Sequence, residues 1–504
     1  MELQLRGITK RFPGVLANDD ISLTARSGTV LALIGENGAG KSTLMNVLTG
    51  LYQADAGEIL IDGQEQRFRG PADSIAAGIG MVHQHFMLVP VFSVYENVIL
   101  GAEPTGRFGV LNRTQARAQV AEVSQRYGLA VDPDSLVEDL PVGIQQRVEI
   151  IKVLLRGARI LIFDEPTAVL TPQEVQEFFG IVAELKSRGA TIIFITHKLK
   201  EALAVADDIT VLRDGRVVGH ADPRTATPED LAAMMVGRAI DLEVDKSPAR
   251  PGSSVLSLRN VTVVDDRGRP VLHSISFDVH AGEIVGIAGI QGNGQTELVQ
   301  AITGLLPVAT GQIEFTGQDI TRMSPRARHA AGMAHVPEDR SRMGFIASFS
   351  VKENLILDSY YAAPYAEGIR LVRNAIDTTA TDLVDRYDVR PPTIDNAGSS
   401  LSGGNAQKMI VAREFSREVP LLVCAQPTRG IDVGSIEYIH EQIVRKRDEG
   451  VAVLIVSTEL DEIFALADRI LVMFSGEIVA ERRTTDTTPP EIGLFMAGQR
   501  AAAS

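Results

Sequence analysis

The chain alternates between continuous apolar runs and segments with helical spacing. Thr29 to Ile34 is a continuous apolar run, and Thr43 to Thr49 follows it with apolar residues at helical intervals. Later apolar runs at Ile160 to Phe163 and Thr191 to Ile195 are rich in β-branched and aromatic residues, which favour strands. Continuous apolar strands separated by helices are typical of a parallel sheet covered on both faces. The pattern therefore predicts an α/β fold with a parallel-sheet core.

Shorter segments predict additional elements around this core. Strands are expected at Leu3 to Thr9, Val15 to Ala25 and Ile59 to Ile61. The dipeptide Asp62-Gly63 follows the last of these and is a hairpin signal. The polar segment from Asn112 to Gln125, rich in Ala and Gln, has helical character.

The pattern then occurs a second time. The apolar run Val30 to Gly35 returns as Ile284 to Gly289, at an offset of 254 residues. Leu140 and Leu401 each open a glycine-containing turn, and they are 261 residues apart. The second copy therefore contains about seven additional residues between these landmarks, and a repeat of this length indicates two homologous domains.

The domain boundaries follow from composition. Residues 245–254 are polar and contain proline and glycine, which is typical of a linker. We predict a first domain at 1–244 and a second at 255–504. Because the linker is short, we expect the two copies to face one another.

Composition narrows the class of protein. A chain of 504 residues is too long for one ordinary core, and the net charge of −15 argues against a nucleic-acid-binding surface, which would normally carry a basic face. The one cysteine, Cys424, excludes an intramolecular disulfide and favours a reducing compartment. No apolar stretch reaches the ~20 residues needed to span a bilayer. We expect a soluble protein whose membrane association, if any, depends on a partner.

The first copy carries a phosphate-binding motif between its apolar strand and its first predicted helix. The motif fits G-x-x-x-x-G-K-[ST] with Gly35, Glu36, Asn37, Gly38, Ala39, Gly40, Lys41 and Ser42. Glycines let successive N–H groups point at a phosphate, and the start of the helix adds partial positive charge. We expect Lys41 to reach the β- and γ-phosphates of a nucleotide and the Ser42 hydroxyl to hold Mg²⁺.

Two carboxylates and a histidine suggest hydrolysis. Asp164 and Glu165 end a buried strand, so Asp164 could hold Mg²⁺ and Glu165 could polarise a water that attacks the γ-phosphate. His197 follows another strand and suits a γ-phosphate contact. Taken alone, the acidic pair also fits a helix cap, a single histidine is more often structural, and Gln84 on a strand is weak evidence.

Together these motifs resemble those of ATP-binding-cassette (ABC) ATPases. The phosphate loop, Gln84, the acidic pair and His197 occur in that family's order and spacing, and the run from Leu401 to Asn405 resembles its LSGGQ signature. Each of the two copies resembles the family, and together they span nearly the whole chain. It implies two tandem P-loop NTPase domains, each with a parallel-sheet core, an antiparallel β subdomain and a helical subdomain, facing head to tail within one chain.

The resemblance also implies cofactors and roles for individual residues. ATP and Mg²⁺ are the expected cofactors; Glu165, His197 and Gln84 are the expected catalytic residues, and Ser42, Gln84 and Asp164 are expected around the metal. Phe12 lies where the family has an aromatic residue that stacks on adenine, although simple packing also explains it. The expected ATP contacts are Phe12, the eight motif residues, Thr43 and the signature residues Ser402, Gly403 and Gly404.

The two copies depart from the family pattern in opposite ways. The second copy has Gln295 in place of Lys41, and it has Glu338, Ala425, Gln426 and Thr458 at the positions of the glutamine, the acidic pair and the histidine. The first copy's signature reads LPVGIQ and lacks the serine and one glycine. Combining the first phosphate loop with the second signature gives one complete site, which indicates asymmetric function.

This asymmetry resembles the ATPase subunits of bacterial carbohydrate and nucleoside importers. The segment His85 to Val98 looks like the nucleoside branch. Its apolar part from Phe86 to Val98 suits docking of a permease helix. We therefore expect a peripheral protein on the cytoplasmic face of the inner membrane, with two permeases, an extracytoplasmic solute-binding protein as an indirect partner, and no nucleic acid. A ribose- or galactose-type sugar importer is the alternative, and a soluble twin-cassette factor acting on ribosomes or DNA is the alternative from another class.

Overall fold

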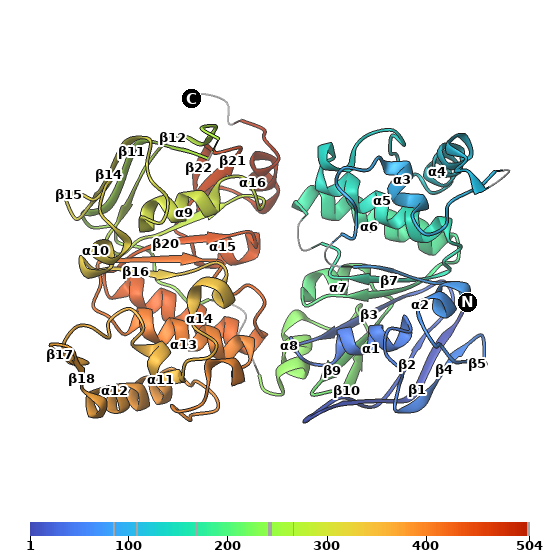
Figure 1. Ribbon diagram of the computed structural model, residues 1–504, viewed down its shortest axis with the longest axis horizontal. Helices are drawn as coiled ribbons and strands as arrows, with labels where there is room; N and C mark the ends of the chain where they lie inside the picture. The colour runs from blue at the N-terminus through green and yellow to red at the C-terminus, as the bar shows by residue number, and fades with distance from the viewer. Residues whose placement is uncertain (84–85, 107–108, 168–169, 240–243, 266, 501–504) are drawn as a thin grey trace. The chain divides into compact units, whose positions relative to one another are not determined.

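The computed structural model describes residues 1–83, 86–106, 109–167, 170–239, 244–265 and 267–500 (Figure 1). The chain divides into two compact units, Met1–Ile240 and Asp241–Ser504. Part of the segment predicted as a linker packs on the second unit, because the Lys246 ammonium donates to the carbonyl oxygens of Leu466 and Ala467 at 2.9 and 2.8 Å.

The first unit contains an antiparallel sheet with the strand order β2-β1-β4-β5. The sequence predicts three of these strands, and the structure confirms the hairpin turn, in which Asp62 and Gly63 both have positive φ angles (49° and 78°). The strands of this sheet are β1 (Leu3–Phe12), β2 (Val15–Ala25), β4 (Ala56–Ile61) and β5 (Gln64–Gln66).

The core of the first unit is a six-stranded sheet with the order β10-β9-β3-β8-β7-β6. Neighbouring strands are parallel from β9 to β6, and β10 is antiparallel at the edge. The strands are β3 (Val30–Gly35), β6 (Ile79–Val82), β7 (Ile160–Asp164), β8 (Thr191–Ile195), β9 (Asp208–Arg213) and β10 (Arg216–Ala221). The predicted parallel-sheet core is therefore confirmed.

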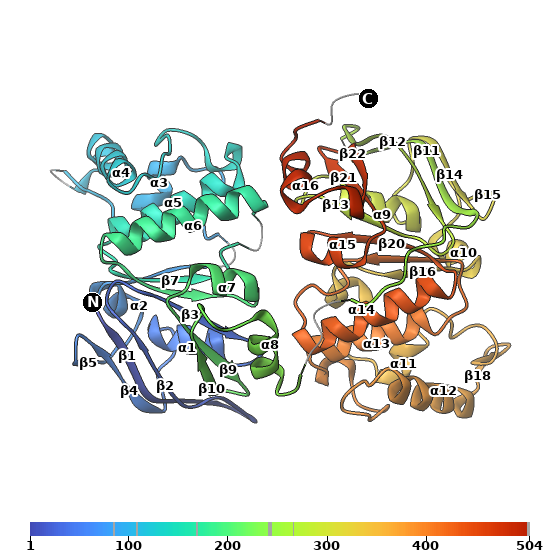
Figure 2. The same cartoon turned by 180° about the vertical axis from the view of Figure 1, so that it is seen from behind.

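Both faces of this sheet are buried, which explains why its strands are apolar throughout. Leu31 and Leu33 pack toward α1 and the antiparallel sheet, whereas Val30, Phe163 and Phe194 pack toward the helical layer (Figures 1 and 2). The helices are α1 (Lys41–Leu48), α2 (Pro71–Ala76), α3 (Val94–Ile99), α4 (Arg113–Tyr127), α5 (Val142–Leu155), α6 (Pro172–Ser187), α7 (Leu199–Val205) and α8 (Pro228–Val236).

The second unit repeats both sheets in the same order, β12-β11-β14-β15 and β16-β19-β20-β13-β21-β22. The strands are β11 (Ser254–Val264), β12 (Pro270–His280), β13 (Ile284–Ala288), β14 (Thr310–Phe315), β15 (Gln318–Asp319), β16 (Met333–Val336), β19 (Leu421–Ala425), β20 (Ala452–Ser457), β21 (Arg469–Phe474) and β22 (Glu477–Arg483). The helices are α9 (Gln295–Thr303), α10 (Pro325–Ala330), α11 (Val351–Leu355), α12 (Arg373–Arg386), α13 (Gly403–Phe415), α14 (Val433–Asp448), α15 (Leu460–Leu466) and α16 (Pro489–Met496).

The extra residues of the second copy enter at two main places. The offset between equivalent elements grows from 254 at β6 and β16 to 257 at α3 and α11, and to 260 at α4 and α12. A π-helical turn at Arg340–Gly344 precedes α11, and a hairpin of β17 (Ala366–Glu367) and β18 (Arg370–Leu371) precedes α12. Both places lie in or beside the helical part of the unit, so the sheet core keeps its register.

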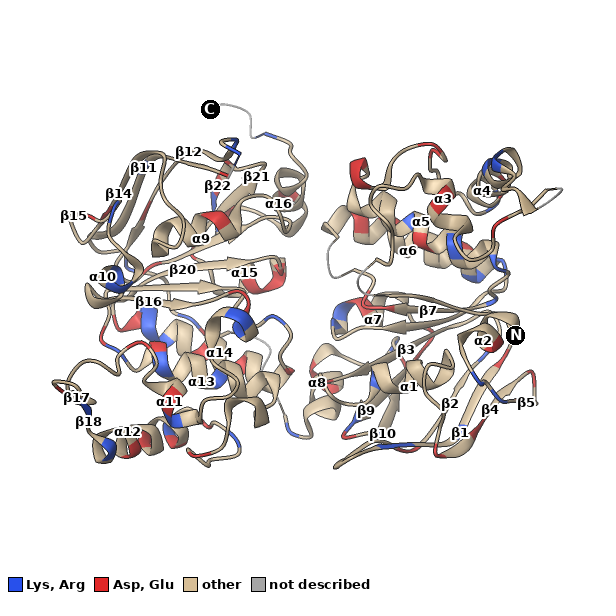
Figure 3. Ribbon diagram, viewed as in Figure 1, with Lys and Arg blue, Asp and Glu red and all other residues tan. Residues whose placement is uncertain are grey.

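The outer helices are polar on their exposed sides. Acidic and basic residues both occur along α12 (Figure 3). Among the described residues, no helix combines the length and the apolar character that a membrane crossing requires.

A buried arginine joins two helices of the second unit. The Arg328 side chain on α10 is 2% exposed, and its guanidinium donates to the carbonyl oxygens of Ala301 and Ile302 at the end of α9, both at 2.6 Å. It also donates to the carbonyl oxygens of Thr321 and Met323. These bonds satisfy carbonyls that a helix end leaves without partners.

Replacing Arg328 by alanine should therefore destabilise the second unit by about 3–5 kcal/mol, because it leaves buried carbonyls without donors and opens a cavity. Urea unfolding of the full chain followed by circular dichroism would measure the change. Arg322→Ala, a change of an exposed arginine nearby, is the matched control and should alter stability little. Equal midpoints for the two variants would contradict the bracing role.

Candidate functional site

The phosphate loop of the first unit connects β3 to α1 through glycines with positive φ angles. Gly38 has a φ of 86° and Gly40 a φ of 97°. A Cβ atom on Gly40 would lie 2.3 Å from the carbonyl oxygen of Ala17, so a side chain there would collide with the backbone of β2. The loop therefore needs glycine at position 40 for both conformation and space.

Two side chains hold this loop in its curled form. The Lys41 ammonium folds back and donates to the carbonyl oxygens of Gly35 at 2.6 Å and Glu36 at 2.9 Å. From β2, the fully buried Asn18 donates through Nδ2 to the carbonyl oxygen of Gly40 at 3.0 Å. Sequence reasoning missed Asn18; the available signal was a polar residue at a core-facing position of an otherwise alternating strand.

The acidic pair lies at the carboxyl end of β7. Glu165 follows Asp164 with a φ of 46°, an uncommon conformation for a residue other than glycine, and its N–H donates to the carbonyl oxygen of Ile195 at 2.9 Å. Nδ1 of His197, just after β8, lies 2.9 Å from Oε1 of Glu165. The structure thus brings together two residues that are 32 positions apart and that sequence analysis had assigned to one reaction.

The charges around this pair influence one another. Burial lowers the pKa of Lys41, and the negative charges of Glu165 and Asp164 oppose that shift. Burial and the neighbouring Glu165 charge raise the pKa of Asp164. Burial disfavours the charged form of Glu165, but the hydrogen bond and charge of His197, with the charge of Lys41, bring its pKa below the usual value. Glu165 is therefore held as a carboxylate, as an acceptor of a proton from water must be.

The remaining predicted residues of the first unit have different settings. Ser42 is exposed at the start of α1 and Thr43 is half-buried behind it. The half-buried Phe12 ends β1, and its ring meets that of Tyr52 edge to face at 5.3 Å, so packing accounts for part of its environment. Gln84 lies outside the described residues.

The signature residues of the second unit cap a helix. Ser402 is the N-cap of α13, and its hydroxyl accepts from the Asn405 N–H and from Asn405 Nδ2, the latter at 2.9 Å. Gly403 and Gly404 form the first turn. In the first unit Pro141 occupies the N-cap of α5 and makes no side-chain cap bond. The first copy, which lacks the serine, therefore lacks the side-chain hydrogen bond that caps this helix in the second copy.

The phosphate loop of the second unit keeps its shape but has lost its charge. Gln295 replaces Lys41, is 6% exposed, and donates through Nε2 to the carbonyl oxygen of Ile290 at 2.9 Å. Its Oε1 accepts from the N–H of Asn293 at 3.1 Å. The hydrogen bond supplied by Asn18 is also absent here, because Leu272 stands at the equivalent position.

The positions of Glu165 and His197 carry uncharged side chains in the second unit, in a similar arrangement. Gln426 has a φ of 50°, like Glu165, and its Oε1 accepts from the N–H and the hydroxyl of Thr458 at 3.3 and 3.2 Å. The Thr296 hydroxyl, at the position of Ser42, donates to Glu338 at 2.8 Å, and Arg429 forms an ion pair with the same carboxylate at 3.1 Å. The Thr296 hydroxyl, which would otherwise meet a metal, is therefore already hydrogen-bonded to a carboxylate that is itself in an ion pair.

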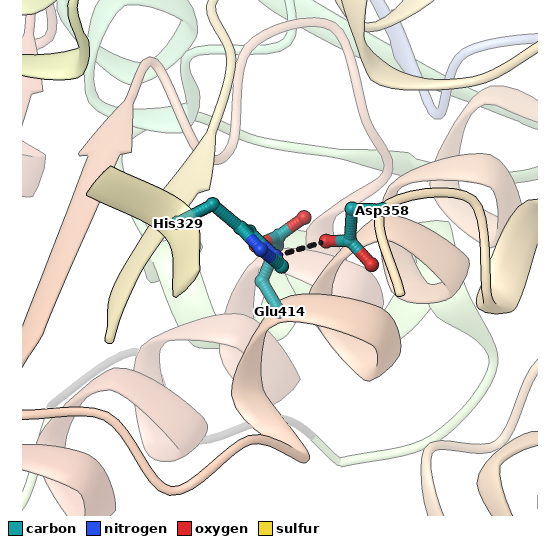
Figure 4. Close-up of side chains that lie close together, drawn as sticks. All are labelled: His329, Asp358 and Glu414. Carbon is teal, nitrogen blue, oxygen red and sulfur yellow. Dashed lines mark hydrogen bonds and ion pairs between the residues drawn. The ribbon is translucent and has the colours of Figure 1, made fainter. Parts of the chain in front are cut away.

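A second cluster of charged side chains lies away from both loops. His329, Asp358 and Glu414 approach one another closely enough to hold a metal ion, with His329 Nε2 2.9 Å from Asp358 Oδ2 (Figure 4). However, Arg413 lies 2.8 Å from Glu414 and 3.7 Å from Asp358, and Arg417 lies 3.7 Å from Glu414. Two guanidinium groups already neutralise the carboxylates, so the cluster is better explained as an ion-pair network that joins α10 to α13.

Comparison with known proteins places this geometry in a family. The model of the ABC transporter family matches residues 18–168 and 272–429. The guanosine import ATP-binding protein NupO of Bacillus subtilis is 47% identical over 98% of this chain and 97% of its own length. The nucleoside import ATP-binding protein NupA of Lactococcus lactis is 48% identical over 98% of both chains. The glucose import ATP-binding protein TsgD13 of Haloferax volcanii is 45% identical over 98% of this chain and 96% of its own length.

A solved structure extends the likeness at the level of fold. The archaeal ribosome recycling factor aABCE1, in complex with the ribosomal stalk protein aP1, matches with a TM-score of 0.59 over 92% of this chain and 87% of its own. At 20% identity that match shows the fold alone. Two family matches in one chain, and relatives that align from end to end, settle the assignment: the chain belongs to the ABC transporter family, with two ATP-binding cassettes in tandem.

Proposed function

We propose that this protein is the ATP-hydrolysing subunit of an importer that takes up nucleosides through partner permeases. The observation that carries the proposal is the end-to-end similarity to import ATP-binding proteins for guanosine and nucleosides, at 47% and 48% identity. Import ATP-binding proteins for glucose, at 45%, and for ribose, at 41%, support the importer class and make a sugar the second candidate cargo.

The site of the first unit supports a role in hydrolysis. Lys41 and the glycine backbone would bind the β- and γ-phosphates of ATP, and Ser42 and Asp164 would hold Mg²⁺, which withdraws charge from the phosphates. Glu165, ionised and hydrogen-bonded to His197, would orient the attacking water and take its proton. The roles of Gln84, Phe12 and the signature residues Ser402, Gly403 and Gly404 stay predictions, as does the head-to-tail pairing of the cassettes.

Glu165→Gln should leave ATP binding intact and lower turnover by about 10²–10⁴-fold, because the amide cannot accept the proton of the attacking water. Gln426→Ala, at the equivalent position of the second unit, should lower turnover far less. Steady-state ATPase assays of the assembled transporter would measure both. Equal losses from the two changes would rule out the asymmetric-site account.

Lys41→Ala should weaken ATP binding by roughly ten- to a hundredfold, because it removes a charged donor from the phosphates. Gln295→Ala changes the equivalent residue of the second loop and should have a smaller effect. Titration with a fluorescent ATP analogue would compare the variants. A defect as large for Gln295→Ala as for Lys41→Ala would show that both loops hold ATP through these side chains.

Apolar side chains beyond β6 support docking to a permease. Within the segment Phe86 to Val98, Met87 and Val91 are 64% and 66% exposed, whereas Val94 and Val98 are buried in the core of the unit. The apolar surface available for docking is therefore smaller than the segment Phe86 to Val98 that the sequence analysis expected to dock. An exposed apolar surface of this kind suits a short amphipathic helix, and methionine can adapt to different partners.

A buried asparagine shapes this loop in both units. Asn97 Oδ1 accepts from the N–H of Val89 at 2.7 Å, and its Nδ2 donates to carbonyl oxygens of the same loop. Asn354 makes the equivalent bonds with Ile346 and Phe349 in the second unit. Ile346 and Phe349 are 38% and 41% exposed, so each unit presents its own apolar loop, consistent with two permeases that differ.

Val91→Glu should abolish solute uptake and recovery with the membrane while ATP binding by the isolated protein survives, because the new charge would have to enter an apolar groove. Val110→Glu is the matched control, since Val110 is also 66% exposed and lies outside the segment. Co-purification with the permeases and uptake by a deletion strain would be measured. Uptake and co-purification that persist in Val91→Glu would show that docking occurs elsewhere.

Uptake of labelled solutes tests the cargo itself. Cells lacking this protein should lose import of guanosine and regain it with the intact gene but not with Glu165→Gln. Loss of ribose or glucose import alone would favour the sugar-importer alternative. Unchanged import of all three would contradict the proposal.

A further inference from the structure

The second unit contains a cavity of about 410 Å³ beside its phosphate loop. Its walls come from the phosphate loop and α9, from the end of β16 and the π-helical turn, and from the ends of β19 and β20. The volume lies within the range of about 300–1,000 Å³ typical of small-molecule sites. The cavity is therefore the second unit's equivalent of the space that the phosphate loop and the acidic pair border in the first unit.

The lining of this cavity does not suit a polyphosphate. Gln295 has replaced the lysine, and Ala425 and Gln426 have replaced the acidic pair. The three charged lining residues are Glu338, Asp339 and Arg342, so the wall offers two carboxylates and one guanidinium. Because Arg429 pairs with Glu338, the charges at this wall balance, and a triphosphate would meet no net positive charge and no lysine in the loop.

The metal position is also closed. The Thr296 hydroxyl donates to Glu338, and Arg429 lies 3.1 Å from the same carboxylate. Oε1 of Gln295 takes the Asn293 N–H, one of the loop donors that would otherwise face a phosphate. Without the loop lysine and without a free metal-binding hydroxyl, a Mg²⁺-bound nucleotide loses its main sources of affinity.

One uncharged polar atom in the lining is buried and has no hydrogen-bond partner among the described residues. Nε2 of His335 is buried and makes no hydrogen bond. Burial, with the nearby Arg413 charge, lowers the pKa of His335 to about 4, so the ring is neutral at physiological pH. A buried polar atom without a partner is uncommon, and a ligand group that reached Nε2 would satisfy it.

We propose that this cavity binds an uncharged nucleoside. Val299, Pro337, Met343 and Val456 form an apolar wall that suits the face of a base, while the amides of Gln291 and Gln300 and the amide nitrogen of Gln426 can pair with base edges and hydroxyls. A free sugar would leave the apolar wall uncovered, so a nucleoside matches the lining better than a monosaccharide.

This inference rests on the proposed function, because imported nucleosides would then reach the protein on the side of the membrane where it works. The second cassette would then bind the imported solute. The substitutions that separate it from the family pattern would have changed its ligand from a nucleotide to a nucleoside. Replacing lysine by glutamine and carboxylates by alanine and glutamine is what a change from polyphosphate to nucleoside requires.

Equilibrium dialysis of the purified full chain with labelled guanosine tests the proposal, with ribose and ATP, with and without Mg²⁺, as competitors. We expect one saturable guanosine site per chain that survives Lys41→Ala and that ribose and ATP displace poorly. Gln426→Asn keeps a residue that tolerates positive φ but shortens the amide, and it should weaken guanosine binding about tenfold. Met343→Trp fills the cavity from a position that is 48% exposed, so it should weaken binding without endangering the fold.

Two results would overturn the proposal. One is the absence of saturable guanosine binding; the other is guanosine binding that Lys41→Ala removes and that Gln426→Asn and Met343→Trp leave unchanged, which would place it at the first loop. Dialysis needs no permease, so its failure leaves the uptake assay intact, and an uptake assay that excludes nucleosides leaves the dialysis result intact.

Discussion

The first cassette depends on placing a buried ammonium group where two carboxylates and a curled backbone meet. Lys41 is 6% exposed, and desolvation alone would disfavour its charge. The carbonyl oxygens of Gly35 and Glu36 and the charges of Glu165 and Asp164 compensate for that loss. The arrangement requires the ends of β3, β7 and β8 to lie at one edge of the sheet, which only the parallel core provides.

The second cassette shows how the same fold is maintained when that charge is removed. Gln295 and Gln426 make neutral hydrogen bonds with loop and strand-end groups, as their charged counterparts do in the first unit, and Gln426 keeps the same positive φ. The substitutions therefore preserve backbone shape while changing the chemistry. Loss of four charged or catalytic groups without collapse of the loop is consistent with a unit under selection for a different ligand.

Sequence reasoning predicted the core well because periodicity and burial coincide there. Thr191 to Ile195 is a strand in the structure with those bounds, and the repeated strand order follows from the repeated motifs. The first helix begins at Lys41, two residues before the predicted start, because the loop glycine at position 40 is its N-cap. Asn18 was missed since it belongs to no motif and acts across 22 residues. The docking segment was drawn too wide because sequence cannot separate the buried Val94 and Val98 of α3 from the exposed Val91 before it.

The number of metal–nucleotide sites per chain tests the central claim of asymmetry most directly. Electron paramagnetic resonance with Mn²⁺ in place of Mg²⁺ can count the ions bound to Glu165→Gln in the presence of saturating ATP. One nucleotide-dependent Mn²⁺ per chain, lost on adding Lys41→Ala, is the predicted result, because the metal positions of the second cassette are uncharged or already engaged by Glu338 and Arg429. Two nucleotide-dependent Mn²⁺ ions per chain would contradict the account.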